Sequence, residues 1–170
     1  MKIRLATMGD AGGIAEIYNH YILNSHATFE LEPISNEEME QRLRNVYENN
    51  YPFLVACSDE EIIGYAYGHP FRARAAYRRT IEISVYVRST CQRRGIARAL
   101  YRELMSKIGS QDSHVVIGGI ALPNVESIRL HEKFGFTRVA QFSQVGYKFD
   151  RWIDVGYWQL ILPAGGNRSN

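Results

Sequence analysis

The segment TIEISVYVRSTCQRRGIARALYRELMSKI, residues 80–108, decides the fold of this chain of 170 residues. Its first eight residues alternate between two sets of side chains, which predicts a β-strand with one buried face. The apolar set is Ile81, Ile83, Val85 and Val87. After a short loop, apolar side chains recur at helical spacing at Leu100, Tyr101, Leu104, Met105 and Ile108. Small residues at Gly95 and Ala97 leave the N–H groups of the first helical turn accessible, and such groups bind phosphate.

Charge is distributed unevenly along the chain. The formal net charge is only +2, which does not indicate a nucleic-acid-binding protein. Between residues 72 and 102, however, nine arginines accompany a single acid, Glu82. They are Arg72, Arg74, Arg78, Arg79, Arg88, Arg93, Arg94, Arg98 and Arg102. A locally basic surface suits a small ligand that carries phosphate groups, although a solvated basic face is the alternative for any single arginine.

Cysteine and histidine usage argues against a disulfide framework and against a metal site. Cys57 and Cys91 form no Cys-x-x-Cys pair, and the five histidines, at positions 20, 26, 69, 114 and 131, lack metal-ligand spacing. No apolar run approaches the length of a membrane span, and the chain begins directly with a strand-like segment. We therefore expect a soluble, cytoplasmic protein with no metal and no membrane partner.

The rest of the chain predicts a mixture of helices and strands. Helices are expected after the capping residues Asp10, Ser35 and Asn124. Strands are expected at 3–6, 53–57, 62–67, 114–120, 138–142 and 154–162. The strand at 114–120 should run parallel to the one at 80–87, because a helix joins them. These elements predict one α/β (α+β) domain over residues 1–162, with a mixed central sheet flanked by helices and a flexible tail at 163–170.

Two motifs resemble those of a known family. QRRGIA, residues 92–97, is similar to the Q/R-x-x-G-x-G/A pyrophosphate loop of the GNAT superfamily of acetyl-CoA-dependent N-acyltransferases, and NVESIRLHEKFGF, residues 124–136, resembles a helix of that superfamily. Residues 80–87 and VGYKFDRW, residues 145–152, resemble the phosphinothricin and methionine sulfoximine acetyltransferases in particular. The resemblance extends from Ile3 to Leu162 and implies the GNAT fold and acetyl-CoA as co-substrate.

Acetylation of an amine needs a base, because the amine is mostly protonated at neutral pH, and a proton source for the departing thiolate. Glu82 is the candidate base from its place on the strand before the phosphate loop, with an ordinary arginine-paired carboxylate as the alternative. The resemblance implies the same role. It also implies that His131 lies near the acceptor, as substrate ligand or acid, although a lone helix histidine is more often packed or solvated. Tyr101 and Tyr86 are further candidate proton donors.

The resemblance implies the binding residues as well. The strand backbone would pair with the pantetheine arm, the loop would hold the pyrophosphate, and the second motif would contact the pantetheine. The cofactor-binding set is Val85, Tyr86, Val87, Arg93, Arg94, Gly95, Ile96, Ala97, Arg98, Asn124 and Ser127. The acceptor-binding set is Phe29, Arg72, Arg74, Tyr77, Ser84, Tyr86 and His131. Arginine suits an anionic acceptor because its planar fork can bind a carboxylate or phosphinate through two hydrogen bonds.

Other enzymes that bind phosphate groups carry different sequence motifs. Neither a G-x-x-x-x-G-K-S/T loop nor a G-x-G-x-x-G turn occurs, so a nucleotide hydrolase or a dinucleotide oxidoreductase is not indicated. We expect direct acetyl transfer to the α-amino group of a small amino-acid analogue of the phosphinothricin, methionine sulfoximine or methionine sulfone type. The alternatives are a protein, peptide or polyamine acetyltransferase and a non-catalytic acetyl-CoA-binding regulatory module. The resemblance further implies a homodimer.

Overall fold

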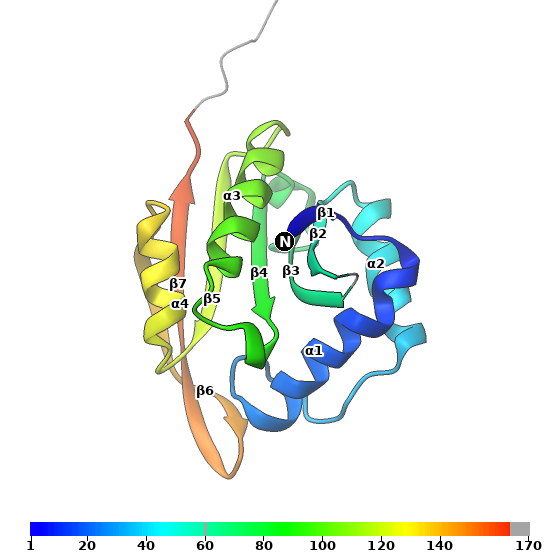
Figure 1. The fold of residues 1–170 in the computed structure, drawn as a ribbon. Helices are drawn as coiled ribbons and strands as arrows, with labels where there is room; N and C mark the ends of the chain where they lie inside the picture. The colour runs from blue at the N-terminus through cyan, green and yellow to red at the C-terminus, as the bar shows by residue number, and fades with distance from the viewer. Residues whose placement is uncertain (60, 164–170) are drawn as a thin grey trace, which may run out of the picture.

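The computed structural model describes residues 1–59 and 61–163. Seven strands form one sheet in the order β1-β2-β3-β4-β5-β7-β6 (Figure 1). Their bounds are β1 Lys2–Leu5, β2 Phe53–Ser58, β3 Glu61–Pro70, β4 Thr80–Val87, β5 Val115–Ala121, β6 Thr137–Lys148 and β7 Arg151–Ile161. The helices are α1 Ala11–Asn24, α2 Asn36–Glu48, α3 Ile96–Gly109 and α4 Val125–Lys133. The predicted mixed sheet with flanking helices is confirmed, whereas the predicted tail, apart from Pro163, lies outside the described residues.

One strand pair sets the topology. β4 and β5 are parallel, as predicted from the helix that joins them, and every other neighbouring pair of the described strands is antiparallel. The crossover between β4 and β5 runs through α3, which carries the chain from one strand to the start of the next. The predicted phosphate loop therefore opens at the carboxyl end of β4, beside the carboxyl end of β5.

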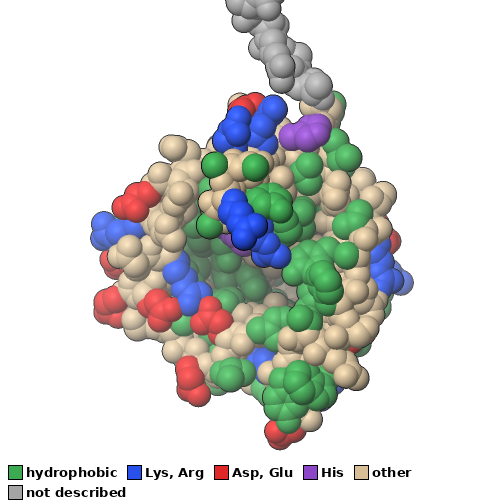
Figure 2. All heavy atoms as spheres, turned by 180° about the vertical axis from the view of Figure 1, so that it is seen from behind, with side chains coloured by type: hydrophobic (Ala, Val, Ile, Leu, Met, Phe, Trp, Pro, Cys, Tyr) green, Lys and Arg blue, Asp and Glu red, His purple; other side chains and the backbone are tan. Residues whose placement is uncertain are grey.

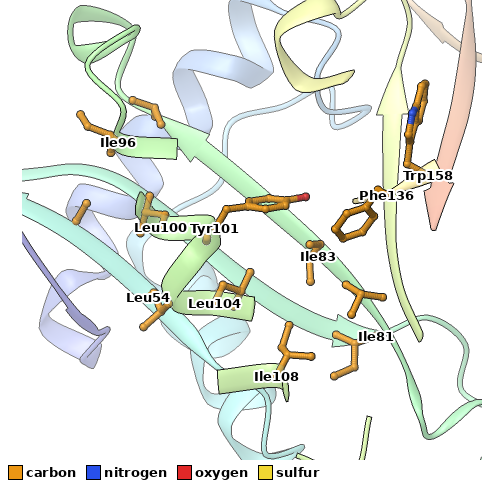
Figure 3. Close-up of a cluster of buried hydrophobic side chains, with 14 of the residues drawn as sticks. Leu54, Ile81, Ile83, Ile96, Leu100, Tyr101, Leu104, Ile108, Phe136 and Trp158 are labelled. Atoms are coloured by element: carbon orange, nitrogen blue, oxygen red, sulfur yellow. The ribbon is translucent and has the colours of Figure 1, made fainter. Parts of the chain in front are cut away.

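Each face of the sheet has its own hydrophobic core. On one face, α3 packs over β2, β3 and β4, and Figure 3 shows its side chains lying over Ile81 and Ile83. The α3 residues in this core are Ile96, Leu100, Tyr101, Leu104 and Ile108. On the other face, α1 and α2 cover β2 and β3. The alternation along β4 thus divides its side chains between the α3 face and the face where Glu82, Ser84 and Tyr86 lie.

Two of the three predicted capping residues make a side-chain hydrogen bond to the first turn of their helix. Ser35 accepts a hydrogen bond from the N–H of Glu38 at 3.1 Å, and Asn124 accepts one from the N–H of Ser127 at 3.0 Å. Asp10 occupies the N-cap position of α1, as predicted, but its carboxylate makes no hydrogen bond to that helix. Asp10 is instead bound by the Arg4 guanidinium at 2.6 Å, and this contact lowers the pKa of Asp10 to about 2.

The C-terminal strands are longer than predicted. The expected connection between 142 and 154 is itself a hairpin, in which β6 continues to Lys148 and β7 begins at Arg151. The two turn residues, Phe149 and Asp150, have φ values of 52° and 54°, the left-handed region that a tight hairpin turn requires. Much of β6 is exposed on both faces, so its sequence lacks the alternation that marks a half-buried strand. Figure 1 shows this hairpin reaching beyond the rest of the molecule.

We expect Leu100→Ala to lower the free energy of unfolding by about 2–5 kcal/mol, because it opens a cavity in the core beneath α3. Leu100 is fully buried there. Denaturant unfolding monitored by circular dichroism measures the change. Arg102→Ala, on the exposed side of the same helix, is the control and should change the free energy by less than about 0.5 kcal/mol. Equal effects of the two substitutions would contradict this packing.

Candidate active site

A cleft opens where β4 and β5 separate. The two strands pair only over Thr80–Glu82 and Val115–Ile117, and beyond that point each follows its outer neighbour, β3 or β7. The resulting space has a volume of about 430 Å³. Its walls come from the ends of β4 and β5, the first turns of α3 and α4, and residues of α1 and the segment after it. The cleft therefore lies between two strands of one sheet.

The strand edges facing the cleft carry free backbone groups. The N–H of Arg88 donates to the carbonyl of Ile63 on β3, so strand alternation directs the backbone groups of Val85 and Val87 to the opposite edge. The carbonyl of Val87 accepts a hydrogen bond from the Tyr21 hydroxyl at 2.7 Å on that side. An extended, amide-containing chain laid into the cleft could pair with this edge as an additional strand would.

The phosphate loop forms the mouth of the cleft. Gly95 has a φ of +78° and precedes α3, and the space where its Cβ would lie is empty to at least 4 Å. The cleft is lined here by Arg93 and by residues 95–98, whose N–H groups include those at the start of the helix. Arg94 is exposed and does not line the cleft. This arrangement suits a pyrophosphate group, since the helix end favours negative charge.

The first turn of α4 forms the opposite wall. Asn124 and Ser127 both line the cleft, and the cap bond between them fixes the Asn124 side chain. Glu126 at the rim lies 3.3 Å from the Arg93 guanidinium, in an exposed ion pair that bridges the two walls. The predicted cofactor residues from both motifs are thus brought together around one cleft, with Arg94 at its outside.

Glu82 lies where the two strands begin to separate. It is half-buried, it stands opposite His69 in the β3–β4 register, and no basic side chain forms an ion pair with it within the described residues. A Cβ added at Gly119 would lie 3.1 Å from its Oε1 atom, so the glycine leaves room for the carboxylate. Burial raises the pKa of Glu82, and the nearby His69 and Arg72 moderate this rise. Glu82 does not line the cleft itself, but it lies beside Gly119, which does, so it is a carboxylate without an ion-pair partner next to the cleft.

His131 lies on the opposite face of the sheet from Glu82. A Cβ added at Gly118 would meet the His131 ring, whereas one at Gly119 would meet Glu82, and successive strand residues face opposite sides. His131 is buried, its Nδ1 donates to the carbonyl of Ser127 at 2.8 Å, and its Nε2 accepts from the Tyr101 hydroxyl at 2.6 Å. Burial lowers the pKa of His131, so the ring is neutral near pH 7. The ring lines the cleft from the α4 side with both nitrogens already engaged.

The predicted acceptor residues do not share one face: His131 lies opposite Glu82, and the others come from three separate segments. Arg72, Arg74 and Tyr77 are exposed in the loop between β3 and β4, next to the end of β4 that carries Glu82. Ser84, two residues after Glu82 on the same face of β4, lines the cleft. Phe29 comes from a different part of the chain, where its ring packs on the backbone of Gly146 of β6, and it does not line the cleft itself.

A second hollow of about 230 Å³ lies beside Glu82 on this face. It is lined by residues of α1, α2, β2 and β3, among them Tyr67 and His69, which stand opposite Ser84 and Glu82 in the sheet. Figure 2 shows a hollow with hydrophobic walls and Lys or Arg side chains above it on the face turned away from Figure 1. Sequence reasoning missed Tyr67, His69, Gly119 and the cleft residue Tyr21, because strand register and helix docking place them there.

The comparisons with known proteins agree with this geometry. Residues 3–156 match the family described as "Acetyltransferase (GNAT) domain". The chain belongs to the GNAT acetyltransferases. The GNAT enzyme described here is similar to the phosphinothricin N-acetyltransferase of Streptomyces viridochromogenes, with 39% identity over 96% of this chain and 90% of that protein. It is also similar to the L-methionine sulfoximine/L-methionine sulfone acetyltransferase of Salmonella typhimurium, with 36% identity over 95% of each chain.

Solved structures extend the comparison to the cofactor. A GNAT phosphinothricin acetyltransferase from Sinorhizobium meliloti in complex with acetyl-CoA has a TM-score of 0.92 and 34% identity, covering 99% of this chain and 95% of that one. YncA from Salmonella typhimurium, with its cofactor acetyl-CoA, has a TM-score of 0.93 and 35% identity over 98% of this chain and 96% of that one. The present GNAT enzyme is an acetyl-CoA-dependent N-acetyltransferase, as its motifs predicted.

Two other features are absent from the described residues. No group of three or more His, Cys, Asp or Glu side chains within residues 1–59 and 61–163 is placed to hold a metal ion. None of the helices in that part of the GNAT enzyme is long and apolar enough to cross a membrane.

We expect Tyr101→Phe to lower the free energy of unfolding by about 1–3 kcal/mol, because the Nε2 atom of His131 loses its hydrogen-bond donor in a buried site. Chemical denaturation of the variant and the wild type measures the loss. The control is Tyr147→Phe, which removes the hydroxyl of a tyrosine that is 53% exposed, and it should be close to neutral. An unchanged stability of Tyr101→Phe would mean that His131 does not depend on this hydroxyl.

Proposed function

We propose that the enzyme transfers the acetyl group of acetyl-CoA directly to the α-amino group of a small amino-acid analogue of the phosphinothricin, methionine sulfoximine or methionine sulfone type. The observation that carries the proposal is the position of Glu82, a half-buried carboxylate without an ion pair, at the last paired position of β4 and β5 and beside Gly119 of the cleft. The names of the two relatives support the class of acceptor. No cysteine lies beside Glu82 to form an acyl-enzyme, since Cys91 is at the mouth of the cleft and Cys57 is on β2.

The cleft supports one orientation of acetyl-CoA. Its pyrophosphate lies at the first turn of α3, where the backbone N–H groups of residues 95–98 bind it and Arg93 adds positive charge. The pantetheine arm runs inward along Val85, Tyr86 and Val87, whose cleft edge supplies hydrogen bonds, with Asn124 and Ser127 on the other wall. The thioester then reaches the point where β4 and β5 meet, next to Glu82. Arg94 contributes only to the electrostatic field, because it does not line the cleft.

Glu82 takes a proton from the acceptor's ammonium group, directly or through a water molecule. Because burial raises its pKa, Glu82 is a stronger base than an exposed glutamate. The resulting amine attacks the thioester carbonyl, and the thiolate of coenzyme A leaves and takes up a proton. His131 lines the cleft, but its neutral ring carries its one N–H proton on Nδ1, bonded to Ser127, so its Nε2 has no proton to give. Water, or the hydroxyl of Tyr86, which also lines the cleft, supplies the proton to the thiolate.

The acceptor occupies the Glu82 face of the sheet. Its carboxylate binds to Arg72 or Arg74 in the exposed loop, which also presents Tyr77. Ser84, Tyr86 and Phe29 complete the surroundings, and the hollow beside His69 offers space for the acceptor's side chain. A polyamine or basic peptide is disfavoured by the exposed arginines at this entrance. A non-catalytic regulatory module is disfavoured by the unpaired base.

We also propose a homodimer in the cytoplasm. The β6–β7 hairpin exposes large apolar side chains that a second copy of the chain would cover. They include Val139, Phe142, Val145, Tyr147, Phe149 and Trp152. The free thiols of Cys57 and Cys91 fit a reducing compartment.

We expect Glu82→Gln to lower kcat by about 10²–10⁴-fold, because the amide cannot accept the proton. In the wild type, the rate should rise with pH as Glu82 loses its proton, and the midpoint of this rise should lie above the ordinary glutamate pKa. In the variant this rise should be absent, and the rate should increase only at the higher pH at which the acceptor amine itself loses its proton. Thiol release from acetyl-CoA measures both, with phosphinothricin, methionine sulfoximine, methionine sulfone, spermidine and a lysine peptide as acceptors. Glu103→Gln, on the exposed side of α3, is the control. A Glu82→Gln rate within twofold of wild type would exclude this base.

We expect Arg74→Ala to raise the KM for the amino-acid acceptor by about tenfold or more while leaving the KM for acetyl-CoA unchanged, because it removes a charged hydrogen-bond donor at the acceptor entrance only. Steady-state kinetics with each substrate varied in turn measures the two constants. Arg44→Ala, an exposed arginine of α2, serves as the control. An unchanged acceptor KM would show that this arginine does not bind the carboxylate.

A further inference from the structure

A buried lysine lies at the end of β6 with no role in the chemistry described above. Lys148 is 3% exposed, and its Nζ donates to the carbonyl of Thr28 at 2.8 Å. This is its only hydrogen bond within the described residues, and the acceptor is a carbonyl rather than a carboxylate. Its partner in the β6–β7 register is Arg151, another cation. Burial lowers the pKa of Lys148 and the nearby Glu30 partly offsets this, while the ammonium also lies 5.1 Å from the centre of the Phe149 ring.

Such a placement is costly, because a buried ammonium group loses most of its hydration. A lysine is therefore expected in this position only where its long side chain and its donor group serve a purpose. The two groups that it joins are 120 residues apart in the sequence. One is the C-terminal hairpin, and the other is the irregular segment that follows α1, whose carbonyls have no strand partner.

The hairpin holds this segment, residues 25–30, at three points. Lys148 binds the carbonyl of Thr28. The Phe29 ring packs so tightly on Gly146 that a Cβ there would lie 2.1 Å from a ring carbon. Arg151 donates to the Nδ1 of His26 at 3.1 Å. Together these contacts fix both the path of the backbone and the orientation of one aromatic ring.

The other side of the segment is anchored to the helices. The Tyr18 hydroxyl of α1 donates to Glu30 at 3.1 Å, so the Thr28 hydroxyl donates to the Tyr18 oxygen at 2.8 Å. Glu30 in turn is bound by Arg42 of α2 at 2.6 Å. The segment is therefore held between the helices and the hairpin, and Lys148 supplies the buried contact on the hairpin side.

This segment borders the site. Ala27 lines the cleft, and Phe29 is a predicted wall of the acceptor pocket. We propose that Lys148 is a positioning residue for the acceptor, which acts through the Thr28 carbonyl to hold residues 25–30, and Phe29 in particular, against the Glu82 face. The proposal rests on the function proposed above for that face. The hairpin thereby supports the acceptor pocket within one copy of the chain.

The test compares Lys148→Met, which keeps the length of the side chain and removes its donor, with the matched control Lys133→Met at an exposed lysine of α4. We expect Lys148→Met to raise the acceptor KM by about tenfold or more, while the KM for acetyl-CoA changes less than twofold, since misplacement of a pocket wall affects only the ligand that it contacts. Hydrogen exchange measured by mass spectrometry should rise in peptides that cover residues 25–33 and stay unchanged in α3. Lys148→Gln, which restores an N–H donor, should recover part of the acceptor KM.

A second variant covers the case in which Lys148→Met does not fold. Gly146→Ala displaces the Phe29 ring without touching the lysine and should raise the acceptor KM in the same selective way. An acceptor KM within twofold of wild type in either folded variant, or a parallel loss of kcat, both KM values and thermal stability, would overturn the positioning role. If the wild type acetylates no amino acid, the proposed function fails, and the exchange of residues 25–33 still decides whether Lys148 holds the segment.

Discussion

The early end of the pairing between β4 and β5 is the constraint on which the rest of the site depends. Each strand keeps full pairing with its outer neighbour, so the two must separate beyond Glu82 and Ile117. Separation leaves the cleft edge of β4 with unpaired backbone groups, which a globular protein normally avoids. A ligand that brings its own amide groups removes this cost. The same separation aligns the first turns of α3 and α4 along one cleft.

Two adjacent glycines of β5 allow His131 and Glu82 to approach the sheet from opposite faces. Gly118 leaves space for the His131 ring on the α3 and α4 face, and Gly119 leaves space for the Glu82 carboxylate on the other. The two environments differ accordingly. His131 is fully buried with both nitrogens bonded, and its pKa is lowered. Glu82 is half-buried with a raised pKa and lies beside the acceptor loop. The cleft passes between the strands and so gives one bound molecule access to both faces.

The acceptor side that we propose is assembled from segments that are distant in sequence. The loop after β3 supplies the arginines, the segment after α1 supplies Phe29, and the C-terminal hairpin holds that segment through Lys148. The loop after β3 and the segment after α1 contain little regular secondary structure of their own. Their positions depend on single contacts, such as the hydrogen bond to the Thr28 carbonyl and the packing of Phe29 on Gly146.

The sequence by itself determined the elements whose signals are local. The alternation along 80–87, the helical spacing after Gly95 and the caps at Ser35 and Asn124 predicted β4, α3, α2 and α4, because periodicity and capping act over a few residues. The loop that ends at Gly95, directly before α3, was predictable for the same reason. Only the tertiary structure decided that His131 binds Tyr101, that His69 stands opposite Glu82 and that Lys148 is buried, because these depend on strand register and on packing between distant segments. The far part of the hairpin of β6 and β7, residues 143–153, also escaped prediction, since β6 is exposed on both faces and its sequence carries no alternation.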